Sequence, residues 1–168
     1  MSEARIQPAS LDDLSAIRDL AIAIWRAHYP GIISREQIDY MLARMYSLET
    51  LRDELQTQRI RFERLLLDDA LVGFAAYGPT TEPKTWKLHK LYLLPEHHGR
   101  GFGSQLLRHC EIQARRLGAR QLLLNVNKHN TKAIAAYQRN GYAISDSVSL
   151  DIGNGFLMDD FVMTKNLS

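Results

Sequence analysis

The sequence has little cysteine, no run of like charges and no long apolar segment, and each shortage excludes a class of protein. Cys110 is the one cysteine among 168 residues, so an internal disulfide is excluded and a reducing, cytoplasmic location is expected. The formal net charge is +2, and no basic run carries interleaved aromatic residues, so no nucleic-acid partner is expected. The apolar stretch 21–25 is much too short to span a membrane. We expect one domain covering residues 1–168.

Two familiar phosphate-binding loops are also missing. No Gly-Lys-Ser/Thr ends a glycine loop, and Gly99, Gly101 and Gly103 alternate instead of following the G-x-G-x-x-G spacing of Rossmann-type nucleotide binders. What residues 91–104 do contain is an apolar strand pattern, a turn at Pro95, the three glycines and then a helical pattern. Free N–H groups at the start of a helix bind anions, and glycines let the backbone come close to a phosphate. We therefore expect a pyrophosphate site at residues 101–104.

Periodicity and capping residues predict the order of secondary structure. Ser10, Ser34 and Ser47 can each begin a helix, with Gln37 as the capping-box partner of Ser34. Strands are predicted at 5–8, 61–67, 71–77, 85–94, 121–127, 142–152 and 156–165, and further helices at 48–56, 102–117 and 131–139. The order βαα(α)βββαβαββ contains a helical crossover between parallel strands, which predicts a mixed α/β (α+β) fold with helices flanking the sheet.

Residues 90–107 closely resemble the acetyl-CoA loop of the GNAT superfamily of acyl-CoA N-acyltransferases. That pattern is a strand, a proline, Q/R-x-x-G-x-G/A and a helix, and here it falls on His98-Gly99-Arg100-Gly101-Phe102-Gly103. His98 replaces the usual Gln or Arg. The resemblance covers nearly the whole chain and is strongest over residues 88–142. It implies a twisted, mostly antiparallel sheet of about seven strands, acetyl-CoA as co-substrate and no metal.

The resemblance also implies which residues hold the co-substrate. The backbone of residues 99–104 and the Arg100 side chain would bind the pyrophosphate. The strand residues before the loop would offer their backbone to the pantetheine arm, and an N–H, that of Leu93, would polarise the thioester carbonyl. The full set of expected contacts is Leu91, Tyr92, Leu93, His98, Gly99, Arg100, Gly101, Phe102, Gly103, Ser104, Asn125, Asn130 and Tyr137.

Tyr137 is the expected acid for the departing thiolate. In the family an Asn opens the helix after the second parallel strand and a Tyr follows two turns later, as Asn130 and Tyr137 do here. Residues seven apart return to nearly the same helix face. The alternative is that Asn130 is only a helix cap and Tyr137 only a core aromatic residue.

The general base is less defined by the sequence. Some GNAT members use a Glu at the position of Asn125, and an amide cannot take its place. His89 is the alternative, since period-two alternation puts it on the strand face of Leu91 and Leu93 and an unperturbed imidazole titrates near neutral pH. A water chain would serve equally. Weaker candidates are Glu96, His97, His98 and His129.

The amine site is expected between the N-terminal helices and the last hairpin, in segments 25–45 and 153–160, which resemble those of small-amine and polyamine acetyltransferases. Residues available to bind a cationic amine are Glu36, Asp39, Asp159 and Asp160, with Tyr40 or Tyr46 as an apolar wall. The predicted function is acetyl transfer to a primary amine. The alternatives are a peptide or protein N-acetyltransferase and a non-catalytic acyl-CoA-binding module. An edge strand of the hairpin could pair two subunits as a homodimer.

Overall fold

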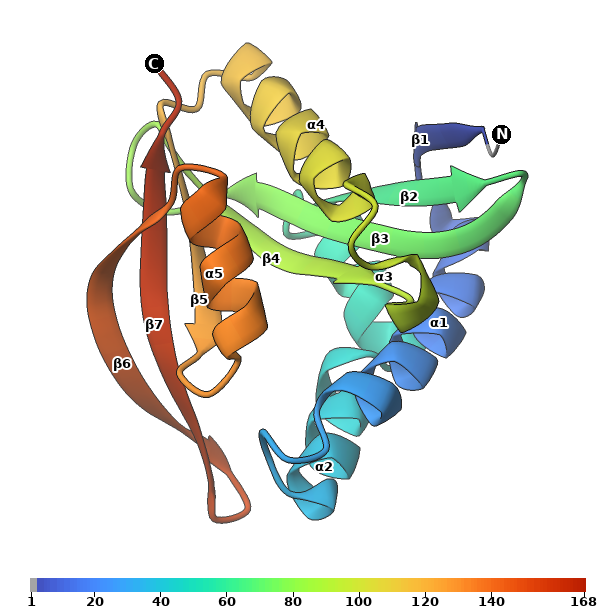
Figure 1. Ribbon diagram of the computed structural model, residues 1–168, viewed down its shortest axis with the longest axis vertical. Helices are drawn as coiled ribbons and strands as arrows, with labels where there is room; N and C mark the ends of the chain where they lie inside the picture. The colour runs from blue at the N-terminus through green and yellow to red at the C-terminus, as the bar shows by residue number, and fades with distance from the viewer. Residues whose placement is uncertain (1–2) are drawn as a thin grey trace.

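A computed structural model describes residues 3–168, which form a seven-stranded sheet flanked by five α-helices (Figure 1). The N-terminal elements are β1 (Ala4–Pro8), a 3-10 turn (Leu11–Asp13), α1 (Leu14–His28), α2 (Arg35–Met45) and α3 (Leu48–Gln56). The middle of the chain forms β2 (Arg61–Leu67), β3 (Ala70–Pro79), β4 (Thr85–Leu93), a 3-10 turn (Pro95–His97) and α4 (Phe102–Arg116). The chain closes with β5 (Gln121–Asn127), α5 (Thr131–Arg139), β6 (Ala143–Gly153) and β7 (Phe156–Asn166).

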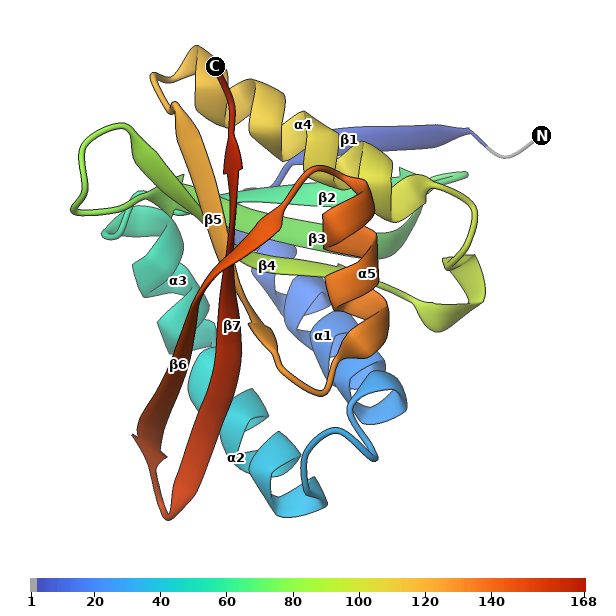
Figure 2. The same ribbon diagram turned by 60° about the vertical axis from the view of Figure 1, so that its left-hand side comes forward.

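The sheet has the order β1-β2-β3-β4-β5-β7-β6, and every neighbouring pair is antiparallel except β4 and β5. Its two faces carry separate apolar cores. Helices α4 and α5 cover one face of the sheet, which we call the α4–α5 face (Figure 2). Helices α1, α2 and α3 cover the other face, which we call the α1–α3 face. Within residues 3–168 no helix has both the length and the apolar character to cross a membrane.

The predicted mixed α/β fold and its element order are confirmed, with boundaries that agree within one or two residues for most elements. Ser47 caps α3 as expected, because its hydroxyl accepts from the Thr50 N–H at 3.1 Å. Of the capping box predicted at Ser34, the Ser34 cap forms and the return contact from Gln37 does not. The Ser34 hydroxyl accepts from the Gln37 N–H at 3.1 Å, but the Gln37 amide donates to the carbonyl of Leu157 at 2.8 Å. That amide therefore joins α2 to the final hairpin.

The two parallel strands separate after a short pairing. Strands β4 and β5 are in register only from Thr85 opposite Gln121 to Leu88 opposite Leu124. Beyond this point each strand follows its other neighbour, β3 or β7, and the two diverge toward their carboxyl ends (Figure 1). A register shift between β3 and β4 leaves His89 as an extra residue between Leu88 and Lys90. The sheet is therefore open between β4 and β5 beyond this point, next to the glycine loop. We call this opening between the two strands the split.

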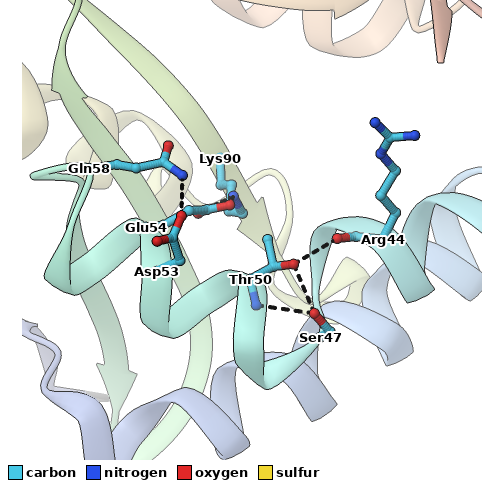
Figure 3. Close-up of polar contacts among 7 residues, drawn as sticks. All are labelled: Arg44, Ser47, Thr50, Asp53, Glu54, Gln58 and Lys90. Carbon is cyan, nitrogen blue, oxygen red and sulfur yellow. Dashed lines mark hydrogen bonds and ion pairs between the residues drawn. The ribbon is translucent and has the colours of Figure 1, made fainter.

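A buried ion pair anchors β4 to the helical layer beneath it. Lys90 and Glu54 of α3 are only 5% and 9% exposed, and the Lys90 ammonium donates to both carboxylate oxygens, at 2.7 and 3.1 Å (Figure 3). The same ammonium lies 5.5 Å from the ring centre of Tyr46 and 5.7 Å from that of Phe62. Because a buried charge is costly without its partner, this pair holds the strand next to the split in one position.

We predict that Glu54→Gln lowers the free energy of unfolding by about 3–5 kcal/mol, because it leaves the Lys90 ammonium buried without a counter-charge. The double replacement Glu54→Leu with Lys90→Met should cost less than this single change. Chemical denaturation measures both. The control is Asp53→Asn, whose carboxylate contacts only the exposed Gln58 among the residues described; an equal loss in this variant would contradict the prediction.

Candidate active site

The edge of β4 that faces the split offers unpaired backbone groups. The Leu94 N–H donates to the Val72 carbonyl on β3 at 2.9 Å. Since successive residues of a strand point their N–H groups to opposite sides, Tyr92 also turns its backbone toward β3, and Leu91 and Leu93 turn theirs toward the split. An extended amide-containing ligand can therefore pair with the backbone of Leu91 and with the N–H of Leu93, since the Leu93 carbonyl already accepts from His98 Nε2 at 2.9 Å. Tyr92, expected to share this backbone role, has its backbone in the β3 ladder.

The glycine loop presents free N–H groups at the end of this edge. Gly101 is the N-cap of α4 with φ +83°, a left-handed conformation that glycine adopts without strain, and no side chain caps the helix there. The N–H groups of Phe102, Gly103 and Ser104 precede the first helical hydrogen bond, from Gln105 N–H to the Gly101 carbonyl. A Cβ on Gly103 would meet no atom within 4 Å, so these groups are approachable from outside. Together with the helix dipole they form an anion site.

Side chains hold this loop in place. His98, the departure from the family pattern, donates from Nε2 to the Leu93 carbonyl at 2.9 Å and so ties the loop to the end of β4. The Arg100 guanidinium lies 4.9 Å from the ring centre of Phe102. The Ser104 hydroxyl accepts from the Asn140 amide at 3.2 Å, which links the first turn of α4 to the end of α5.

Asn130 and Tyr137 lie on α5 beside the split. The Asn130 side chain is 6% exposed, and its Oδ1 caps α5 at Ala133 N–H and also accepts from His28 Nε2 at 3.2 Å, joining α5 to the end of α1. Tyr137 packs edge-on against Tyr142 at 5.8 Å. Burial, with the nearby Tyr29 and Cys110, raises the pKa of the Tyr137 hydroxyl well above its usual range. Tyr137 therefore keeps its proton at neutral pH.

Tyr29, which lies in the expected amine-site segment, and Tyr92, which belongs to the expected co-substrate contacts, form a pair that the sequence did not predict. The hydroxyl groups of Tyr29, at the end of α1, and Tyr92, on β4, are 3.1 Å apart. Burial raises the pKa of Tyr29 to about 12, with the charge of Asp160 acting in the same direction. The sequence signal for Tyr29 was the helix break at Tyr-Pro-Gly, which marks the end of α1 but not the contact with a residue 63 positions away.

His89 lies at the bulge of β4, so simple alternation does not fix its direction. Leu88, Leu91 and Leu93 all belong to the core of the α4–α5 face, which requires the side-chain phase to shift by one at His89. Burial, with Lys87 and Lys90 nearby, lowers the pKa of His89 to about 4. Its imidazole is neutral at pH 7. Asn125 is the first β5 residue past the paired segment, and by alternation it faces away from the buried Leu124 and Val126.

The candidates for amine binding differ sharply in environment. Asp39 pairs with Arg26 and Asp159 with Lys128, each at 2.7 Å, and Glu36 is exposed. Asp160 alone of the four is buried. Tyr46 lies in the core, and the Tyr40 hydroxyl donates to the Ile152 carbonyl at 2.6 Å, which holds the final hairpin against α2. The expected proximity of N-terminal helices and last hairpin is confirmed by this contact.

The remaining expected base candidates are peripheral. Glu96 and His129 are exposed, His97 is part of the 3-10 turn after β4, and His98 is occupied with the Leu93 carbonyl. A separate hollow of about 540 Å³ between α1 and α2 is lined by Arg26, Gly31 and Arg35 among others, and includes no residue of the glycine loop. That hollow is therefore separate from the glycine loop and from the opening between β4 and β5.

Comparison with known proteins agrees with this geometry. The family model described as acetyltransferase (GNAT) family matches residues 16–142. A spermidine N(1)-acetyltransferase of Thermoplasma acidophilum is 28% identical over 158 residues, covering 92% of this chain and 94% of that protein. The crystal structure of the PaiA N-acetyltransferase of the same organism, in complex with coenzyme A, superposes with a TM-score of 0.83 at 28% identity, covering 98% and 99% of the two chains.

A more distant structure shows the fold alone. The ribosomal-protein-S18-alanine N-acetyltransferase of Escherichia coli has a TM-score of 0.72 at 19% identity, covering 99% of this chain and 95% of its own. The matches to the family model and to the relatives confirm the resemblance read from residues 90–107. The chain belongs to the acetyltransferase (GNAT) family and is an enzyme of the acyl-CoA N-acyltransferase class.

We predict that the low pKa of His89 causes the free energy of unfolding to fall at mildly acidic pH. A histidine with a folded pKa of about 4 and an unfolded pKa near 6.5 contributes stability above pH 6.5 that is lost as the pH falls toward 4. This loss should be about 1–2 kcal/mol between pH 7.5 and pH 5. His89→Gln should remove it, as measured by chemical denaturation at both pH values. His129 is exposed, so His129→Gln serves as the control. If this variant also removes the loss of stability between the two pH values, the low pKa of His89 is wrong.

Proposed function

We propose that this enzyme transfers acetyl from acetyl-CoA directly to a primary amine of a small amine or polyamine. The observation that carries the proposal is the open β4 edge at Leu91 and Leu93, which runs from the split to the free N–H groups of α4. Coenzyme A is an extended pseudo-peptide with a pyrophosphate at one end, so its two kinds of polar group match the two kinds of site. The coenzyme A complex of the related PaiA enzyme supports the same assignment.

Each step of acetyl transfer has a candidate group on this chain. The amine nitrogen attacks the thioester carbonyl, and the N–H of Leu93, which faces the split, stabilises the oxyanion. As the carbon–sulfur bond breaks, Tyr137 gives its proton to the sulfur. The Tyr137 hydroxyl is protonated at neutral pH and can therefore donate, and solvent restores its proton after the transfer.

The amine must also lose a proton, and water is the favoured acceptor. A pKa of about 4 makes His89 a weak base, and Asn125 has no basic group. A water chain ending in bulk solvent requires no titrating residue, which agrees with both features. His89 then has a structural role at the bulge rather than a role as the proton store.

A small acceptor is favoured over a peptide by the closed end of the split. The hairpin between β6 and β7 is bonded to α2 through Tyr40 and Arg44 to the Ile152 carbonyl, at 2.6 and 2.7 Å, and through Gln37 to the Leu157 carbonyl. A peptide acceptor needs an open groove at this side. The 28% identical spermidine acetyltransferase supports a polyamine acceptor. A non-catalytic acyl-CoA-binding role is disfavoured by the presence of Tyr137 in the expected position.

We predict that Tyr137→Phe reduces kcat by roughly 10–10⁴-fold while the KM for acetyl-CoA stays within a few-fold, because only the proton donor is removed. Thiol release from acetyl-CoA with a panel of amines measures the reaction. The control is Tyr142→Phe, which removes a hydroxyl that donates to Glu111 at 2.8 Å and should lower stability but not kcat. Unchanged kcat in Tyr137→Phe would exclude the acid role, and absence of thiol release from the wild type with every amine would overturn the proposed function.

We predict that Gly103→Ala stabilises the free protein and weakens acetyl-CoA binding. Alanine in the first turn of α4 gains about 0.5–1 kcal/mol over glycine, and its Cβ stands beside the free N–H groups. For the wild type, acetyl-CoA at ~100 times its Kd should add ~2.7 kcal/mol, or roughly 5–10 °C in Tm. The variant should start from a higher Tm and lose about half of this shift. ATP at equal concentration is the control; an equal shift with ATP would contradict the coenzyme A assignment.

A further inference from the structure

Asp160 differs from the other buried carboxylates of the described chain in having no direct partner. Glu54 contacts Lys90, Glu63 accepts from the Tyr77 hydroxyl at 2.9 Å, and Glu111 accepts from the Tyr142 hydroxyl at 2.8 Å. Asp160 is 3% exposed, the least of the four, yet over residues 3–168 its side chain makes no hydrogen bond and no ion pair within 4 Å. Neither carboxylate oxygen is completely buried, so the group keeps a small opening to solvent in place of a protein partner. A carboxylate with so little water around it gains from a cationic ligand.

Its position is at the acceptor side of the split. Asp160 lies opposite Asn127, the last residue of β5, and its neighbours Phe161 and Val126 pack into the core of the α4–α5 face. By alternation Asp160 therefore points to the α1–α3 face. Its charge acts on Tyr29, whose hydroxyl contacts Tyr92 on β4. The carboxylate is thus on the same face as the Tyr29–Tyr92 pair and within electrostatic range of Tyr29.

No lysine, arginine or histidine among the described residues forms an ion pair with the Asp160 carboxylate. The adjacent Asp159 is the residue that pairs with Lys128, at 2.7 Å. Lys87 on β4 has the largest effect of any positive charge on the pKa of Asp160, and it forms no ion pair with Asp160 within 4 Å. Burial raises the pKa of Asp160, the positive charges of Lys87 and Lys128 oppose this rise, and the negative charge of Asp159 adds to it. No cation of the described residues is in contact with this carboxylate, so a cation from a ligand can take that position.

We propose that Asp160 binds a second, non-reacting ammonium group of the acceptor, so that the enzyme selects diamines and polyamines over monoamines. An ammonium ion supplies the hydrogen bonds and the charge that the buried carboxylate lacks. The bound nitrogen cannot be the attacking one, because a carboxylate in contact stabilises the protonated form and the attacking nitrogen must be neutral. The acceptor therefore carries at least two amino groups. This inference rests on the proposed function.

Calorimetric titration of the protein saturated with coenzyme A tests the inference without turnover, using spermidine and n-butylamine as probes. The wild type should bind spermidine at least tenfold more tightly than n-butylamine. Asp160→Asn should weaken spermidine binding by roughly ten- to a hundredfold and abolish this preference, with little change for n-butylamine and none for coenzyme A. Its Tm should be equal to or higher than that of the wild type, because an unpaired buried charge is removed.

The matched control is Asp159→Asn, which neutralises the neighbouring carboxylate already paired with Lys128 and should change spermidine affinity less than threefold. Failure of the wild type to bind spermidine, tight binding by Asp160→Asn, or an equal loss in Asp159→Asn would overturn the assignment. If spermidine binds as expected but releases no thiol from acetyl-CoA, the proposed function fails and the assignment of Asp160 is supported.

Discussion

The separation of β4 from β5 after four residue pairs is the constraint on which the rest of this structure depends. Backbone N–H and C=O groups inside a protein need partners, and a sheet normally supplies them from the next strand. Here the facing edges of Leu91–Leu93 and Asn125–Asn127 lack that strand. The buried Lys90–Glu54 pair fixes one side of the opening, and the β5–β7 ladder fixes the other. Both sides of the opening are therefore held by contacts outside it, and its unpaired groups are available to a ligand.

The candidate groups around the split lie on different faces of the sheet. On the α4–α5 face lie the anion site of the glycine loop and the protonated Tyr137. On the α1–α3 face lie the Tyr29–Tyr92 pair and, by alternation, Asp160. In the proposed function, the two reactants enter from opposite faces and meet where the sheet is open. The contact between His28 and Asn130 crosses this region and joins the two layers at the end of α1.

Most of the secondary structure could be predicted from the sequence, because it depends on neighbouring residues. The cap at Ser47, the glycine loop, and the helical spacing of Asn130 and Tyr137 are all local signals. The bulge at His89 could not be predicted, since it appears only in the register with β3. Nor could the burial of Asp160 and its lack of a partner, which depend on residues far away in the chain. The low pKa of His89 arises from the same distant packing, and it weakens the expectation that His89 is the general base.

The hydrogen bonds between α2 and the final hairpin have a consequence for how such an enzyme can change. Residues 85–139, one continuous segment, provide β4, the glycine loop, α4, β5 and α5. The opposite wall is assembled from α1 and α2 near the start of the chain and from β6 and β7 at its end, joined through Tyr40, Gln37 and Ile152. If this wall binds the acceptor, as in the proposed function, substitutions at the two ends of the chain can change it while the central segment is left intact. Acceptor specificity can then change in evolution separately from the thioester chemistry, because different parts of the chain supply the residues for each.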